Sequence, residues 1–157
     1  MIAHLFRIVG MLILAIASAF SWGADSALHK TANGIELYYG VVPAEAVQAH
    51  VKQHGAESMH GKTRLARGTH HLVVTLYDAK TSEPIPGAAV SATVTQLGLS
   101  QETKTLDVMK INNTISYGNY FNMPPNDSPY RITLAIRRPT DHTPVPVEFE
   151  YRHGVSR

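Results

Sequence analysis

Histidine is the residue type in this sequence whose number and spacing could support chemistry. The chain has nine histidines in 157 residues and no cysteine. Five histidines fall in one short stretch: His50, His54, His60, His70 and His71. Imidazole nitrogen binds copper, zinc, nickel and iron alike, so this density favours a metal site without fixing the metal. Without thiolates, a site for a soft metal must combine imidazole with methionine sulfur.

The first candidate pair is His50 and His54, in a segment with helical periodicity that starts at Pro43. Residues i and i+4 leave the same face of a helix, so the two imidazoles can share one ion. The pair also alternates with Val47 and Val51, which would make it the border of an amphipathic helix instead. The spacing leaves both interpretations open.

Met59 and His60 form a second candidate, because a thioether beside an imidazole suits copper, and Cu(I) in particular. The alternative is an exposed pair in a loop. His70 and His71 open a segment of alternating residues, so their rings should point to opposite faces of a strand. They cannot chelate one ion as a pair, and we expect one of them to be structural; the sequence does not say which.

Met109 is a third candidate. A regular strand pattern puts Met109 on the same face as Thr105, Asp107 and Ile111, a mixed set of neighbours rather than an apolar stripe. A ligand and a methionine that fills the core both remain open for this position.

Motifs of catalysis are missing from the sequence. It contains no Gly-x-Ser-x-Gly, no His-Glu-x-x-His, no phosphate-binding glycine loop and no cysteine nucleophile. Acidic residues are spread singly along the chain. We therefore expect no enzyme. Removing Arg7 with the N-terminal segment leaves 13 basic against 12 acidic residues, and the bases are scattered, so nucleic acid is not an expected partner.

Residues 1–24 have the order of a secretory signal peptide. Arg7 supplies the positive charge, residues 8–20 are an apolar run, and small residues precede Asp25. The apolar run is shorter than the roughly 20 residues that span a bilayer. We expect cleavage after Ala19, Gly23 or Ala24, leaving residues 25–157 as one periplasmic domain.

Period-two hydrophobic patterns separated by Pro, Gly and Asn turns dominate the rest of the chain. They cover residues 35–42, 72–77, 90–95, 106–108, 117–121, 130–137 and 145–151. Short strands at this spacing are typical of a sandwich. The fold prediction is an all-β, immunoglobulin-like antiparallel β-sandwich of about seven strands, with a short helical or loop insert after the first strand.

Residues 105–123 resemble a segment of the periplasmic copper-binding proteins that accompany bacterial iron permeases. That family has a ligand methionine, a ligand histidine seven positions later directly before Tyr-Gly, and a further methionine. Met109, Tyr117-Gly118 and Met123 match in place, whereas Ser116 stands at the histidine position. Residues 33–36 and 130–139 resemble the family's first and penultimate strands.

This resemblance implies a dimeric immunoglobulin-like sandwich that acts in high-affinity iron uptake beside an inner-membrane permease. It also implies that Met109 is a metal ligand and that other residues replace the missing histidine. A second likeness, of residues 73–90 to transthyretin-like modules, supports the fold and says nothing about function. The candidate ligands, in order of preference, are Met109, His60, His71, His70, His142 and Met59.

The preferred hypothesis is a periplasmic metal-binding protein for copper, with iron or zinc as alternatives, acting in metal uptake, delivery or homeostasis. The alternative is a metal-free interaction module that docks on an envelope or membrane protein. Metal binding requires several candidate side chains to converge within about 4–5 Å of one point, given metal–ligand bonds near 2.0–2.3 Å. An interaction module predicts that they are dispersed.

Overall fold

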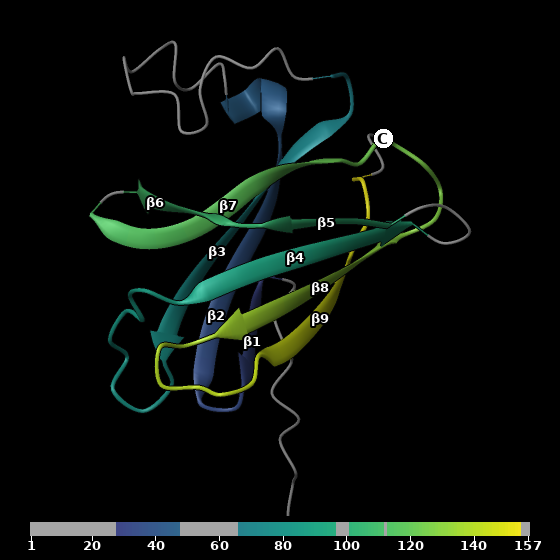
Figure 1. The fold of residues 1–157 in the computed structure, drawn as a ribbon. Helices are drawn as coiled ribbons and strands as arrows, with labels where there is room; N and C mark the ends of the chain where they lie inside the picture. The colour runs from purple at the N-terminus through teal and green to yellow at the C-terminus, as the bar shows by residue number, and fades with distance from the viewer. Residues whose placement is uncertain (1–27, 48–65, 97–100, 112, 155–157) are drawn as a thin grey trace, which may run out of the picture.

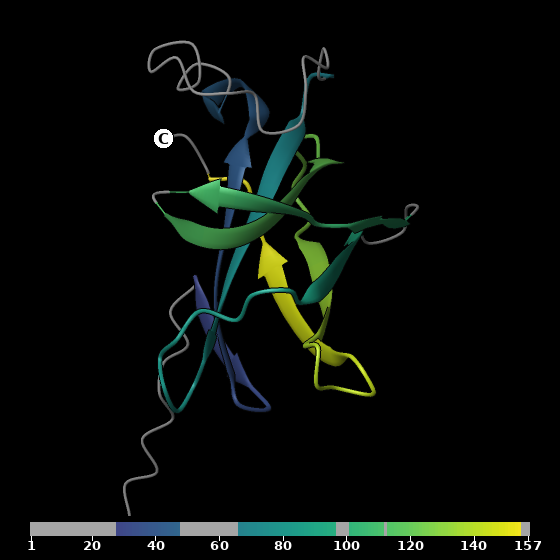
Figure 2. The same ribbon diagram turned by 60° about the vertical axis from the view of Figure 1, so that its left-hand side comes forward.

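The computed structural model describes residues 28–47, 66–96, 101–111 and 113–154. These residues form two antiparallel sheets packed as a β-sandwich, which confirms the predicted fold class (Figures 1 and 2). The strands of the described residues are β1 (His29–Ala32), β2 (Ile35–Pro43), β3 (Thr69–Asp78), β4 (Ala89–Gln96), β5 (Gln101–Thr105), β6 (Asp107–Ile111), β7 (Thr114–Asn122), β8 (Tyr130–Arg137) and β9 (Val145–Tyr151).

One sheet has the strand order β1-β2-β3-β7-β6 and the other the order β5-β4-β8-β9. Alternate residues of the strands fill the space between the sheets, as the period-two patterns predict. The largest fully buried side chains of this core include Ile35, Leu37, Leu72, Leu76, Phe121, Ile132, Leu134 and Ile136. The other residues of each strand therefore lie on the outer faces.

The described residues contain nine strands rather than about seven. The polar residues before Gly34 form β1, which pairs with β2 through a turn in which Asn33 and Gly34 have φ of 46° and 75°. Asn-Gly is the preferred pair for such a hairpin turn, so this signal was present in the sequence. The second additional strand, β5, is an edge strand of alternating polar residues.

The predicted insert begins directly after β2, where residues 44–47 are helical and Ala44 is buried. His50, His54, Met59 and His60 lie outside the described residues. Within the part of the chain that the structure describes, no helix has the length and apolar character needed to cross a membrane.

Tyr117 fixes the orientation of the strand that carries the Tyr-Gly motif. Its side chain is only 1% exposed, and its hydroxyl donates to the carbonyl of Ile85 and accepts from the backbone N–H of Ala88, both at 3.1 Å. Because side chains alternate along a strand, the inward position of Tyr117 places Ser116 and Gly118 on the outer face of the five-stranded sheet.

Candidate metal centre

The outer face of the five-stranded sheet brings two predicted ligands together. His71 of β3 pairs with Tyr120 of β7, and Met109 of β6 pairs with Ser116 of β7. Directly paired residues share a sheet face. Strand β7 lies between β3 and β6, so His71 and Met109 approach each other from its two sides, across Gly118.

Gly118 leaves the space in which the two side chains meet. A Cβ atom at this position would lie 2.6 Å from the terminal Cε of Met109 and 2.9 Å from Nε2 of His71. It would also lie 2.9 Å from the carbonyl oxygen of Leu72. The tips of the imidazole and the thioether side chain therefore reach the same point above the glycine, closer than any side chain at residue 118 would allow.

Both candidate ligands are shielded from solvent, His71 with 1% and Met109 with 6% of its surface exposed. The ring of Tyr120 lies against the His71 ring, with centroids 4.6 Å apart and planes tilted by 33°. Burial raises the pKa of the Tyr120 hydroxyl, so this neighbour remains a neutral phenol at physiological pH. The imidazole of His71 therefore packs against the aromatic ring of Tyr120.

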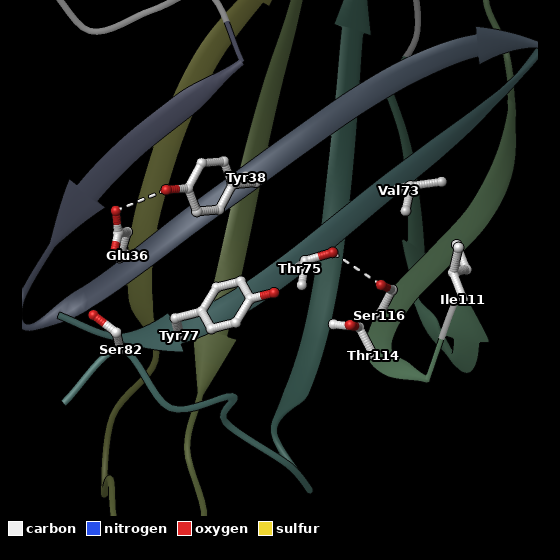
Figure 3. A pocket seen from close by; sticks show the side chains of 9 residues that line it. All are labelled: Glu36, Tyr38, Val73, Thr75, Tyr77, Ser82, Ile111, Thr114 and Ser116. Carbon is white, nitrogen blue, oxygen red and sulfur yellow. Dashed lines mark hydrogen bonds between the residues drawn. The ribbon is translucent and has the colours of Figure 1, made fainter.

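Ser116, at the position of the family's histidine, is buried and engaged elsewhere. Its Oγ lies 2.9 Å from Oγ1 of Thr75, an interaction visible in Figure 3. Ser116 also lines an open groove of about 740 Å³ that continues along the same face toward Tyr38 and Tyr77. The Tyr38 hydroxyl donates to Glu36 at 2.9 Å on the far side of this groove.

The structure separates the remaining described candidates from this pair. His70 points to the opposite face of β3, where its ring lies 5.7 Å from that of Tyr151. His142 is exposed in the loop between β8 and β9. This loop lies at the end of the sandwich opposite to the start of β3, where His71 pairs with Val42 (Figure 1). Met59 and His60 fall outside the described residues, so their positions stay predictions.

Three-residue metal clusters built from His, Cys, Asp or Glu do not occur among residues 28–47, 66–96, 101–111 and 113–154. The described candidates that lie together are therefore two, one imidazole and one thioether side chain. Both residues are candidate ligands from the sequence, whereas Gly118, which allows their approach, was not among the predicted site residues. The Tyr-Gly motif was the available signal for it.

The sequence matches no family model and no curated protein. Solved structures with this sandwich fold are similar over most of the chain. They establish an all-β sandwich with the same fold as the structures of FetP and P19.

One similar structure is FetP of uropathogenic Escherichia coli strain F11, expressed in the periplasm, with 19% identity and a TM-score of 0.54 over 79% of this chain and 92% of that chain. A copper-bound variant of FetP has 20% identity and a TM-score of 0.52 over 78% and 93% of the two chains. Copper-reconstituted P19 of Campylobacter jejuni has 17% identity and a TM-score of 0.51 over 78% and 92%. At these identities the likeness shows a common fold.

Proposed function

We propose that this protein is an exported copper-binding protein that acts in metal uptake, delivery or homeostasis. The observation that carries the proposal is the convergence of His71 and Met109 over Gly118. The copper-bound state of structures with the same fold supports it. The sequence contains none of the catalytic motifs named above, so the proposed role is binding rather than catalysis.

The donor set favours copper. A thioether is a soft ligand that suits Cu(I), and imidazole binds both oxidation states. A buried site with one sulfur ligand and one nitrogen ligand beside an aromatic ring should bind Cu(I) more tightly than Zn²⁺ or Fe²⁺. Met59 and His60 are the proposed additional ligands, because the segment that contains them leads directly into β3, where His71 lies.

The proposed physiological role follows the resemblance of residues 105–123. The chain would bind copper outside the cytoplasm after removal of residues 1–24 and serve an inner-membrane permease in iron or copper transport. Within one chain His142 lies at the other end of the sandwich from His71. It would therefore act as a ligand only from a second copy in a homodimer.

Calorimetric titration of residues 25–157 with Cu(I), Cu(II), Fe(II) and Zn(II) tests the proposal. We expect stoichiometric Cu(I) binding that is weakened at least tenfold in Met109→Leu and His71→Ala. His142→Ala is the matched control. If the protein is a monomer, this variant should bind Cu(I) with wild-type affinity. Absence of stoichiometric binding by every ion would refute a metal-binding function. Cu(I) binding that survives both substitutions would refute the ligand assignment alone.

The open groove lined by Tyr38 and Tyr77 supports the alternative function, an interaction module without metal. Tyr38 and Val42 expose 46% and 38% of their surfaces on this face. A photo-crosslinking residue at position 38, compared with one at exposed Lys80, would test it in producing cells. Crosslinks to an envelope protein at position 38 only, together with no metal binding, would favour this alternative.

A further inference from the structure

A second pair of histidines lies on the core side of β3, facing away from His71. The rings of His70 and His153 have centroids 4.8 Å apart and planes at 68°. His70 is 5% exposed and belongs to β3 of the five-stranded sheet, whereas His153 follows β9 of the four-stranded sheet. The pair therefore joins the two sheets at the end of the sandwich where β3 begins.

A backbone carbonyl fixes the proton of His70. Its Nδ1 lies 3.0 Å from the carbonyl oxygen of Gly68, and a carbonyl can only accept a hydrogen bond. Nδ1 must therefore carry the hydrogen in the neutral ring. The lone pair is left on Nε2, the nitrogen at the tip of the ring.

The same arrangement holds for His153. Its ring is hydrogen-bonded to the backbone of Met123. The Met123 N–H already donates to Gly68, so the Met123 carbonyl accepts from the histidine. Nε2 of His153 is buried and has no hydrogen-bond partner among the described residues, which assigns this bond to Nδ1. The result is a buried nitrogen lone pair with nothing to bind, which is costly.

We propose that His70 and His153 form a second metal site, which binds a divalent ion such as Zn²⁺ or Cu²⁺ through their Nε2 atoms. Histidine ligands in proteins characteristically donate their other ring N–H to a carbonyl or carboxylate, and both rings here do so. The pair alone supplies two nitrogen ligands, and water completes the coordination.

The spacing of the rings fits a shared ion. An ion bound to Nε2 of both rings at 2.0–2.1 Å would lie about 3.2 Å from each ring centroid. The centroid separation of 4.8 Å is then compatible with a nitrogen–metal–nitrogen angle of about 100°, near the tetrahedral value. Two imidazoles without sulfur favour Zn²⁺ and Cu²⁺ over Cu(I). The two sites of this protein should therefore differ in metal preference.

Imidazole-detected nitrogen NMR on residues 25–157, with and without Zn²⁺, tests this site residue by residue. Before zinc is added, His70 and His153 should both show the Nδ1–H form. Zinc should shift the Nε2 resonances of both rings, while exposed His142 serves as the control. Zinc should also raise the melting temperature, since the ion joins the two sheets, and His153→Ala should abolish that increase.

Unshifted Nε2 resonances in His70 and His153 at saturating zinc would overturn the proposal. An unchanged zinc affinity and stoichiometry in both His153→Ala and His153→Gln would also overturn it. Because His153 is partly exposed, both variants should fold, and circular dichroism checks this. Failure of this second site can be distinguished from failure of the proposed copper site. Met109→Leu should leave the zinc shifts intact, and His153→Ala should leave Cu(I) binding intact.

Discussion

Adding one methyl group at Gly118 should damage both the folding and the copper site of this protein. In Gly118→Ala the new Cβ would lie 2.6 Å from Cε of Met109 and 2.9 Å from Nε2 of His71. The methionine can rotate away, but the Leu72 carbonyl oxygen, also at 2.9 Å, belongs to the backbone of the paired strand. Overpacking of this kind costs about 1–3 kcal/mol of unfolding free energy.

Gly40→Ala is the matched control for this substitution. Gly40 lies on the same face in β2, opposite Val73, and no atom of the described residues would lie within 4 Å of a Cβ at this position. The extra methyl group should leave stability unchanged or raise it by about 0.4–1 kcal/mol, because alanine restricts the unfolded chain. The two variants thus add the same methyl group to the two strands that flank β3, with opposite expected effects.

Urea unfolding and Cu(I) competition titration measure the two consequences. For Gly118→Ala we expect a lower midpoint and a copper affinity reduced at least tenfold, which corresponds to about 1.4 kcal/mol of binding free energy. Gly40→Ala should retain wild-type copper affinity. If Gly118→Ala has the same urea midpoint and the same Cu(I) affinity as Gly40→Ala, then Gly118 is not needed for the close approach of His71 and Met109.

Three further substitutions probe the site and the surface. Ser116→His should raise Cu(I) affinity at least tenfold in competition titrations, because it adds an imidazole opposite Met109; weaker binding would contradict the placement of the site on this face. Met109→Leu should cost less than about 1.5 kcal/mol in urea unfolding, since the volume is conserved, and a larger loss would mean a mainly structural role. Arg138 holds the pKa of Asp141 below its usual 3.8 through a hydrogen bond at 2.7 Å. A depressed pKa stabilises the fold above the unfolded-state value and loses this effect as pH falls through the folded-state value. Asp141→Asn should therefore be less stable than wild type near pH 7, and the difference should shrink as the pH falls below 3.8 and through the folded-state pKa of Asp141; a difference constant with pH would contradict this.

The sequence predicted most of the sandwich because its inner and outer residues alternate clearly. Leu72, Val74 and Leu76 are buried as the pattern of β3 required. Strand β5 was missed because its residues are polar on both faces, and an edge strand needs no apolar face to pair. β1 was read as a polar lead-in although Asn33-Gly34 marks its turn.

The candidate site was predicted in its residues but not in its geometry. Alternation alone placed His70 and His71 on opposite faces, as observed. It could not place Met109 beside His71, because that neighbourhood depends on β7 lying between β3 and β6, a long-range strand order that no local pattern encodes. No local pattern pairs His153 with His70, because the two residues are 83 positions apart in the sequence.

The placement of two histidines side by side on β3 has a consequence for folding. A slip of β3 by one residue against its neighbours would exchange the two sheet faces and remove both His71 and His70 from their partners at once. Metal bound at either site would therefore stabilise only the native pairing of β3 with its neighbouring strands. If both proposed sites bind metal, an ion acquired after export would stabilise the native strand register. The chain has no disulfide that could fix this register.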